Sequence, residues 1–343
     1  MKRILLFLSV FLSANLFGQN VYISDTNFKA YLVGNSEINT NGDAEIQISE
    51  ASVFDGEIDV YGQDISDLTG IEAFTSLTRL NCNLNNLTSI DVSQNTALKY
   101  LNCGKNPLTS LDVSNNADLE ELYCRWNPLT SLDVSNNIAL THLVCIYNLL
   151  TSLDVSQNTA LTYLNCSANP FTTLDVSQNT ALTHLQCEVN SLTSLDVSQN
   201  TALIYLLCYF NQLTTLDVSQ NTALLYLWCE YNQLTCLNMA NGNNINFTLF
   251  RATENPNLNC VQVDDAEWSS ANWTDFNGQI DPQMYFSEDC NNDCTANITE
   301  LSTSKNLIQI FDLMGRETSF KPNTPLIYVY DDGSIEKVFS VEY

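Results

Sequence analysis

One cysteine recurs every 21 residues along the middle of this 343-residue chain, and no other feature constrains the fold as strongly. The recurring residues are Cys82, Cys103, Cys124, Cys145, Cys166, Cys187, Cys208 and Cys229. An asparagine follows each of them three residues later, at Asn85, Asn106, Asn127, Asn148, Asn169, Asn190, Asn211 and Asn232. A unit this short cannot bury its apolar side alone, so the repeats must stack into one continuous array.

Within each unit the apolar residues alternate with polar ones. Leu80 and Cys82 alternate with Arg79 and Asn81, which is the pattern of a short strand with one face turned inward. The wider pattern, L-x-x-L-x-C-x-x-N-x-L, resembles the leucine-rich repeat of internalin-like proteins over residues 77–240. The resemblance implies a mostly β leucine-rich repeat solenoid of about eight 21-residue coils, with N- and C-terminal caps and a small β C-terminal sorting domain.

The cysteine column is interpreted as part of the core. Neighbouring strands lie about 4.8 Å apart, which a disulfide could span, but stacked side chains point in parallel and not toward each other. A free cysteine is a small side chain that is usually buried. We therefore predict eight reduced thiols that fill the core, although twelve cysteines in an exported chain would ordinarily indicate disulfides.

The remaining repeat positions complete each coil. Asn85 is expected to bond buried backbone groups from inside the coil, because its amide both donates and accepts. Ile90 and Val92 point inward on a second extended leg, and Asn95 supplies turn chemistry. The aspartates of the Asp91 column would repel each other by roughly 1 kcal/mol per neighbouring pair in water. Hydrogen bonds to turn N–H groups and the following serine are the favoured offset, with bound divalent cations as the alternative.

The outward positions vary from coil to coil and are rich in aromatic rings, which dominate binding hot spots. The predicted non-catalytic binding face consists of Tyr100, Tyr123, Trp126, His142, Tyr163, His184, Tyr205, Tyr209, Tyr226, Trp228 and Tyr231. Its expected ligand is an extracellular protein or glycan. The alternative is an aromatic ladder that stabilises the sheet through contacts between neighbours.

The chain offers little material for catalysis, and we expect no enzymatic activity. Its only histidines, His142 and His184, are two coils apart, about 9.6 Å, which is too far for one metal ion or one proton relay. No Ser-His-Asp or Cys-His arrangement can be assembled from these positions. The formal net charge of −27 argues against nucleic acid and anionic membrane surfaces as partners.

Residues 39–50 read NTNGDAEIQISE and resemble a calcium-binding EF-hand loop, preceded by a short helix capped near Asp25. The resemblance implies possible calcium ligands at the side chains of Asn39, Asn41, Asp43 and Glu50 and at the backbone carbonyl of Glu45. Two positions depart from the family pattern, because the first is Asn instead of Asp and the sixth is Ala44 instead of Gly. The alternative is a cap that keeps the loop shape without the ion.

Four cysteines lie outside the ladder, Cys236 in the last repeat and Cys260, Cys290 and Cys294 after the repeats, where the open end of a solenoid needs a cover. A disulfide-closed cap is a common device, and we predict the pair Cys260–Cys290. The pairing of Cys236 and Cys294 is left open.

The two ends of the chain resemble export signals. Residues 1–19 have Lys2 and Arg3 before an apolar run too short to span a bilayer, which is typical of a signal peptide. Residues 304–343 predict short strands with turns, and DLMGR at 312–316, NTPLIY at 323–328 and DGS at 332–334 resemble the type A sorting domain of type IX secretion. That resemblance implies the type IX secretion machinery as a partner; the alternative is a plain β-hairpin tail.

The sequence thus predicts six segments. They are a signal peptide (1–19), an N-terminal cap with the EF-hand-like loop and a degenerate first coil (20–76), the leucine-rich repeats (77–240), a C-terminal cap (241–294), a linker (295–303) and a sorting domain (304–343). The expected protein is extracellular or on the cell surface, has no membrane span, and binds a protein or glycan. The rival function is a structural or adhesive surface protein without a specific ligand.

Overall fold

A computed structural model describes residues 19–290, 307–312, 318, 326–330 and 335–338. The chain divides into two compact units, Met1–Ala296 and Asn297–Tyr343, and each is described by itself. The predicted signal peptide falls almost entirely outside the described residues, as do the predicted linker, Cys294 and the proposed turns of the C-terminal domain.

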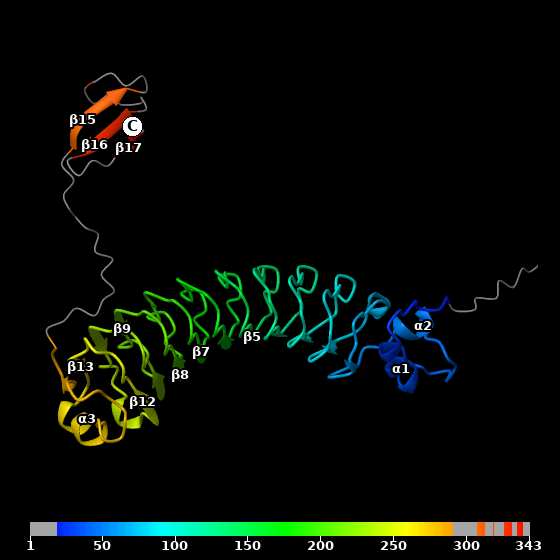
Figure 1. Cartoon of the computed structure of the whole chain (residues 1–343), viewed down its shortest axis with the longest axis horizontal. Helices are drawn as coiled ribbons and strands as arrows, with labels where there is room; N and C mark the ends of the chain where they lie inside the picture. The colour runs from blue at the N-terminus through cyan, green and yellow to red at the C-terminus, as the bar shows by residue number, and fades with distance from the viewer. Residues whose placement is uncertain (1–18, 291–306, 313–317, 319–325, 331–334, 339–343) are drawn as a thin grey trace, which may run out of the picture. The chain divides into compact units, whose positions relative to one another are not determined.

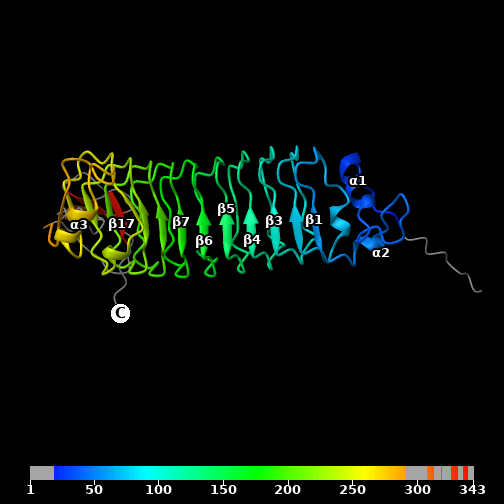
Figure 2. The same ribbon diagram turned by 90° about the horizontal axis from the view of Figure 1, so that it is seen from below.

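The first unit is built on a parallel sheet of ten strands. In spatial order they are β1 (Glu57–Asp59), β2 (Arg79–Asn81), β3 (Tyr100–Asn102), β4 (Glu121–Tyr123), β5 (His142–Val144), β6 (Tyr163–Asn165), β7 (His184–Gln186), β8 (Tyr205–Leu207), β10 (Tyr226–Trp228) and β12 (Leu249–Arg251). The strands pair in register, so that Tyr163 lies beside His142 and His184. Figure 1 shows that they line the inner, concave side of a curved solenoid, and Figure 2 shows them side by side.

The solenoid extends beyond the eight regular coils: the expected irregular coil precedes them and contributes β1, and a further irregular coil that was not predicted follows them and contributes β12. In the last one, Phe250 stands beside Leu227 and continues the inward column of leucines. Asn255 takes the place of the repeat asparagine, but it comes 23 residues after Asn232 and not 21. This small insertion hides the coil from a search for a fixed period.

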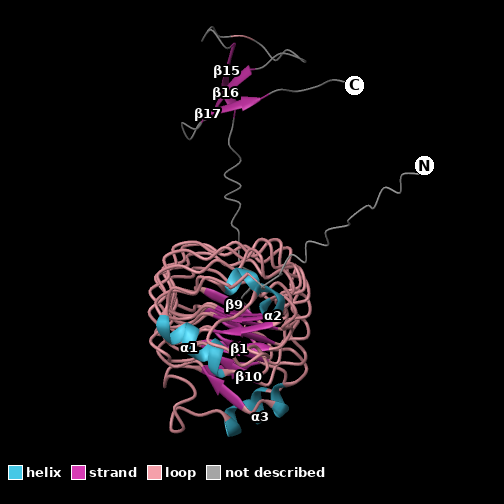
Figure 3. Cartoon of the chain, turned by 90° about the vertical axis from the view of Figure 1, so that its right-hand side faces the viewer, coloured by secondary structure: helices cyan, strands magenta, loops and turns pink. Residues whose placement is uncertain are grey.

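The second leg of each coil is extended, and it forms regular strands only toward the C-terminal end. There a four-stranded parallel sheet contains β9 (Thr215–Asp217), β11 (Cys236–Asn238), β13 (Cys260–Gln262) and β14 (Tyr285–Ser287). Over the rest of the solenoid this side is loop. Figure 3 looks along the stack of coils, with loops surrounding the strands. The coils are nevertheless tied together there, since Val92 and its counterparts are fully buried.

The eight ladder cysteines are free and fully buried, as predicted. The predicted role of the first asparagine column is also confirmed. The amide of Asn106 donates to the carbonyls of Cys82 and Cys103 at 3.0 and 3.1 Å, and its oxygen accepts from the N–H of Leu87 at 3.0 Å. One side chain therefore satisfies backbone groups of two coils.

A second asparagine column is buried on the opposite side of the core, and here the sequence interpretation was incomplete. Asn95 was expected only to shape a turn, but it is fully buried together with its counterparts in later coils. Asn116, for example, donates to the carbonyls of Val92 and Asn95 at 3.1 and 2.8 Å. Each coil is thus joined to the preceding one by buried amides on both legs.

The aspartate column is explained by local hydrogen bonds. The Oδ1 atom of Asp112 accepts from the N–H of Ser114 at 2.9 Å, and the other six aspartates repeat this bond at 2.8 to 2.9 Å. The hydroxyl and the N–H of Ser114 lower the pKa of Asp112 below its ordinary value. The favoured account is therefore confirmed and no bridging cation is needed.

Both ends of the stack are covered. The predicted helix is present as α1 (Thr26–Gly34), and its N-cap Asp25 accepts from the N–H groups of Asn27 and Phe28. A second short helix, α2 (Ile48–Ala51), and a 3₁₀ turn, η1 (Ile71–Ala73), complete this end.

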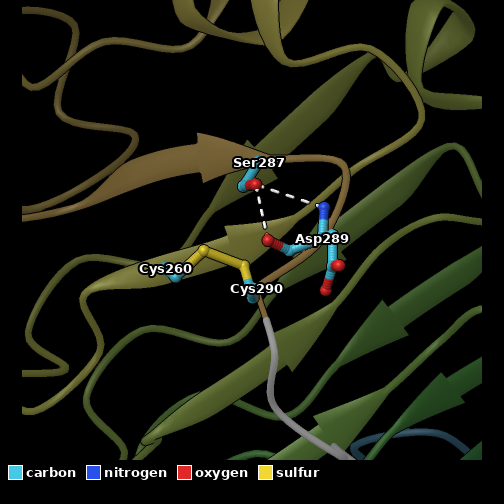
Figure 4. The surroundings of a disulfide bond; sticks show 4 residues. All are labelled: Cys260, Ser287, Asp289 and Cys290. Carbon is cyan, nitrogen blue, oxygen red and sulfur yellow. Dashed lines mark hydrogen bonds between the residues drawn. A yellow bond between two sulfur atoms is a disulfide. The ribbon is translucent and has the colours of Figure 1, made fainter.

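At the other end, η2 (Asn244–Asn246) and α3 (Ala266–Asn272) precede Trp273, which packs against Phe250 and Phe286 with ring centroids 4.7 and 5.6 Å apart. The predicted Cys260–Cys290 disulfide is present (Figure 4). Beside it, the Ser287 hydroxyl donates to the carbonyl of Asp289 and accepts from its N–H. Cys236 is disulfide-bonded as well.

The second unit contains a three-stranded antiparallel sheet in the order β15 (Leu307–Asp312), β16 (Leu326–Tyr330) and β17 (Ile335–Val338). Short strands were expected in this region. Among the described residues, no helix is long and apolar enough to cross a membrane.

The ladder thiols are predicted to be unreactive in the folded protein. Burial shields them and raises the pKa of Cys103 to about 12, so the nucleophilic thiolate is scarce. Iodoacetamide should leave all eight unmodified in the native mature protein and alkylate all eight in denaturant, as counted by mass spectrometry. Disulfides joining Cys103, Cys124 and Cys145 would contradict this assignment.

Candidate functional site

The exposed face of the ten-stranded sheet carries the variable residues in columns along the solenoid axis. In each coil, residues at alternate positions share this face because successive strand side chains point to opposite sides. His184, Gln186 and Glu188 are one such set, and the inward Leu185 and Cys187 lie between them. The sheet therefore presents rows of side chains spaced by one coil.

The first column contains an unbroken run of five stacked or tilted rings. His142, Tyr163, His184, Tyr205 and Tyr226 follow one another with centroid separations of 5.7, 5.7, 5.6 and 5.2 Å. Those separations fall within the range in which aromatic pairs attract each other. All five side chains are partly exposed. The rings form a single continuous surface across five coils.

The two histidines of this column are held in one orientation by the preceding threonines. The Thr183 hydroxyl lies 3.0 Å from the carbonyl of Thr162, to which it donates, and 2.9 Å from Nδ1 of His184. Since its proton goes to the carbonyl, we assign the ring proton to Nδ1, and Nε2 is left as an acceptor. Thr141 holds His142 in the same way. Burial, and then the nearby His142, lower the pKa of His184, which favours its neutral form.

At the N-terminal end of the face, charged groups meet the rings. The Arg79 guanidinium lies 4.0 Å from the ring centroid of Tyr100, which in turn packs against Tyr123 at 5.5 Å. The Tyr123 hydroxyl donates to Glu121 at 2.8 Å. Burial, followed by this bond to Glu121, raises the pKa of the Tyr123 phenol. These side chains are therefore fixed before any ligand arrives.

At the C-terminal end the rings form a broader cluster. Tyr209 packs against Trp228 at 4.8 Å, and the Trp228 indole N–H donates to Glu230. Glu230 also meets Arg251, whose guanidinium lies 5.3 Å from the Trp228 ring. Beyond these residues a groove of about 730 Å³ opens between the last coils and the cap, where Phe276 is 94% exposed.

Trp126 and Tyr231 lie in the turns at the edge of this face. Both residues have a left-handed backbone conformation, with φ angles of 58° and 52°. Trp126 stacks on Tyr147 at 4.0 Å, and Tyr231 stacks on Phe210 at 4.2 Å. All four rings are 43 to 50% exposed. Holding a non-glycine residue in this conformation costs on the order of 1 kcal/mol, so the edge displays large rings at strained positions.

One buried carboxylate on the face was not singled out from the sequence. Glu188 is only 9% exposed, and its Oε2 atom has no hydrogen-bond partner among the described residues. Burial raises the pKa of this carboxyl, although its own N–H and the Ser167 hydroxyl act in the opposite direction. In the sequence Glu188 is one of several variable residues in a column that also contains Arg125 and Glu230, and its spacing does not mark it as buried.

The EF-hand-like loop is closed by its own hydrogen bonds. Glu50 accepts from the N–H groups of Thr40, Asn41 and Gln47 at 2.9, 3.1 and 3.0 Å and from the Thr40 hydroxyl at 2.9 Å. The Glu50 carboxylate, which would have to coordinate calcium, is therefore already hydrogen-bonded to donors of the loop.

The other proposed calcium ligands are engaged as well. Asp43 accepts from the side-chain amides of Asn41 and Gln47, the Asn41 oxygen accepts from the N–H of Asp43, and the Asn39 oxygen accepts from the N–H of Gly42. No cluster of three His, Cys, Asp or Glu side chains that could hold a metal ion occurs in the described part of the chain. These residues do not fit a calcium ion in this arrangement, and the calcium site remains a prediction.

The structure brings nine of the predicted face residues into three contacting groups. The five-ring column is the largest group, and Tyr209 and Trp228 form a second one. Tyr100 and Tyr123 form the third group. Trp126 and Tyr231 belong to the edge pairs. Arg251 was missed because it belongs to the irregular coil.

Several known proteins are similar to this chain in sequence or in structure. A family model described as the leucine-rich repeat domain of the endo-β-N-acetylglucosaminidase EndoS matches residues 43–158. Internalin J from Listeria monocytogenes serotype 4b (strain F2365) is 37% identical over 78 residues, which is 22% of this chain and only 8% of that protein.

Two solved structures are also similar. The functional domain of InlJ from Listeria monocytogenes, which includes a cysteine ladder, is 30% identical with a TM-score of 0.56, over 78% of this chain and 70% of that one. The leucine-rich repeat domain of APL1B is 18% identical with a TM-score of 0.50, over 62% and 72% of the two chains, and indicates the fold alone.

Removal of calcium is expected to leave the stability unchanged, whereas Glu50→Gln should lower the free energy of unfolding by roughly 1–3 kcal/mol at pH 7. Burial would raise the pKa of Glu50, but the bonds from Gln47, Asn41 and Thr40 outweigh it and hold that pKa below the ordinary 4.5. The stabilisation is therefore present above pH 4.5 and is lost as the pH falls through the lowered value.

Thermal melts with and without chelator, at pH 7 and in acid, measure both effects. The exposed Glu37→Gln serves as the control. A calcium-dependent rise in melting temperature that Glu50→Gln abolishes would restore the EF-hand interpretation.

Proposed function

Because this chain belongs to the internalin-like leucine-rich repeat proteins, we propose that it is an exported, non-catalytic binding protein whose strand face recognises another protein. One observation carries the proposal. The frame of leucine, cysteine and asparagine hardly changes, while the outward residues vary and place five consecutive rings in one continuous surface. Rigid, partly exposed rings supply contact area at a low cost in conformational entropy.

A glycan is the second candidate ligand. The stacked edge pairs Trp126–Tyr147 and Phe210–Tyr231 favour it, because they offer flat apolar ring faces to the solvent. We place a protein first because the main column is accompanied by charged and amide groups in fixed positions, including Arg79, Glu121 and Glu230. Such fixed polar groups set specificity at protein interfaces.

The rival function is purely structural, with the ring column acting as a ladder between coils. If this rival function is correct, removing the rings lowers the stability of the fold and leaves ligand affinity unchanged, since a ladder contributes only to stability.

We also propose that the C-terminal unit directs the chain to the type IX secretion machinery and hence to the cell surface or medium. Three observations support this. The segment resembles a type A sorting domain, its strands β15–β17 form a sheet of their own, and it separates from the solenoid as a compact unit.

Replacing Tyr163 and Tyr205 together by Ser should weaken partner binding by about 2 kcal/mol or more for each hot-spot ring. The full mature protein, immobilised, serves as bait for surface proteins and for a glycan array, and affinities are then measured for each captured ligand. The matched control is Ile138→Thr, which restores the repeat residue at a position 64% exposed. Equal affinity of the double variant and wild type, with a lowered melting temperature, would favour the structural rival.

Deleting residues 304–343 should leave the melting temperature of the repeat unit almost unchanged, within the ±0.5 kcal/mol typical of remote surface changes. In a host with type IX export, the truncated chain should accumulate in the periplasm, as followed by cell fractionation. Normal surface delivery would rule out the sorting role, and a large loss of stability would show that the segment is part of the folded solenoid.

A further inference from the structure

Two buried carboxylates lie on the exposed face of the sheet, one on each side of Tyr209. Glu188 and Glu230 both follow a ladder cysteine directly, in coils two apart, and are 9% and 6% exposed. A carboxylate removed from water costs several kcal/mol unless a countercharge and hydrogen bonds compensate it. The two residues differ in how far this compensation is provided.

The negative charge of Glu230 is compensated by groups of this chain. One oxygen accepts from the Thr253 hydroxyl at 2.9 Å and lies 3.5 Å from the Arg251 guanidinium, and the other accepts from the Trp228 indole. The same guanidinium lies 5.3 Å from the centroid of the Trp228 ring. A carboxylate, a ring and a guanidinium thus form one group.

Glu188 lacks a countercharge. Its Oε2 atom has no hydrogen-bond partner in the described structure, and its own N–H and the Ser167 hydroxyl are the groups that stabilise its charge. The sequence contains no Lys or Arg between Arg125 and Arg251. Both of these are three coils away, about 14 Å at a spacing of 4.8 Å.

Histidine does not supply the missing charge either. His184 is in the same coil as Glu188, but burial and then His142 lower its pKa, so the ring is neutral at pH 7. The described residues therefore leave Glu188 without a countercharge, which a bound partner can supply.

The neighbouring coil offers the aromatic half of the same arrangement. Tyr209 is the next residue in the column of Glu188, and Tyr205 is on the same strand face. Burial, followed by the Glu188 carboxylate, raises the pKa of both phenols. Guanidinium groups lie over rings twice elsewhere on this face, as Arg79 does at Tyr100 and Arg251 at Trp228.

We propose that Glu188, Tyr205 and Tyr209 form a receptor site for one arginine side chain of a protein partner, an assignment that rests on the proposed protein-binding function. The partner's guanidinium meets the Glu188 carboxylate at the small part of this side chain that is exposed and lies against a tyrosine ring, as Arg251 does at Glu230 and Trp228. A neutral side chain at this point leaves the carboxylate buried without a countercharge, so the site selects for arginine. The net charge of −27 assists the approach of a cationic segment.

The test uses N-acetyl-arginine amide as the probe and N-acetyl-citrulline amide, its uncharged isostere, as the control ligand. We expect a saturable change in the carboxylate ¹³C resonance of Glu188 in the full mature protein with the arginine probe and none with citrulline. Glu188→Gln should weaken the affinity for the arginine probe by about tenfold or more. Glu37→Gln, at an exposed position in the N-terminal cap, should leave binding of the probe unchanged. Equal binding of both ligands, no binding, or equal affinity of Glu188→Gln and wild type would overturn the proposal.

A second measurement needs no variant. Saturation of wild type with the arginine probe should lower the pH at which Glu188 titrates, because the guanidinium favours the charged form. An unchanged titration would contradict the site.

The stability of Glu188→Gln provides an independent check. Because its folded pKa is raised, the charge destabilises the fold as the pH rises above the ordinary 4.5, so the variant should melt higher than wild type at pH 7.5 and equally near pH 4. A lower melting temperature at pH 7.5 would mean that the chain already compensates this charge and would overturn the proposal.

Failure here is distinguishable from failure of the proposed function. If a captured partner is lost with Tyr163→Ser and Tyr205→Ser but binds Glu188→Gln normally, the strand face is a binding surface and Glu188 is not its arginine site. If the capture fails while the probe binds at Glu188, the site exists and the proposed function is wrong.

Discussion

Each coil of this solenoid is closed by a buried asparagine amide that reaches into the coil before it. Asn106 bonds the carbonyls of Cys82 and Cys103 and the N–H of Leu87, so one side chain holds the turn of its own coil and the backbone of its neighbour. A buried backbone group without a partner costs about 1–3 kcal/mol, which makes every coil depend on the next. The second column, through Asn116 and its counterparts, repeats this dependence on the opposite leg.

Because the amides and the inward leucines and cysteines fix the backbone, the outward residues are free to vary without loss of the fold. The same strict spacing brings like positions within contact distance in successive coils, and this turns scattered residues such as His142, Tyr163 and His184 into one ring column. It also isolates charges. In a stretch without Lys or Arg, Glu188 cannot find a countercharge in its own or the adjacent coils. The regular frame is therefore the physical origin of both the proposed binding face and the proposed arginine site.

The two ends of the solenoid are stabilised differently from its middle, because a terminal coil has a neighbour on one side only. At the N-terminal end, Glu50 draws donors from Thr40, Asn41 and Gln47 and fixes a loop that otherwise resembles an ion site. At the C-terminal end, Trp273 packs on Phe250 and the Cys260–Cys290 disulfide ties the last strands together. Both devices replace the missing coil with local cross-links.

The 21-residue period by itself determined the stack, the inward position of the cysteines and their free state, since a period reports a contact that recurs between neighbours. The N-cap at Asp25 was equally readable, because capping is local in the sequence. Only the tertiary structure decided that Asn95 is buried, that the loop at Glu50 is filled by its own donors, and that a tenth strand follows an insertion. It alone showed that the Oε2 atom of Glu188 is buried without a hydrogen-bond partner among the described residues, whereas both carboxylate oxygens of Glu230 have one. The reason is that rotamers and hydrogen-bond partners depend on atoms from coils 21 to 23 residues away, and residue type at a fixed spacing does not specify where those atoms lie.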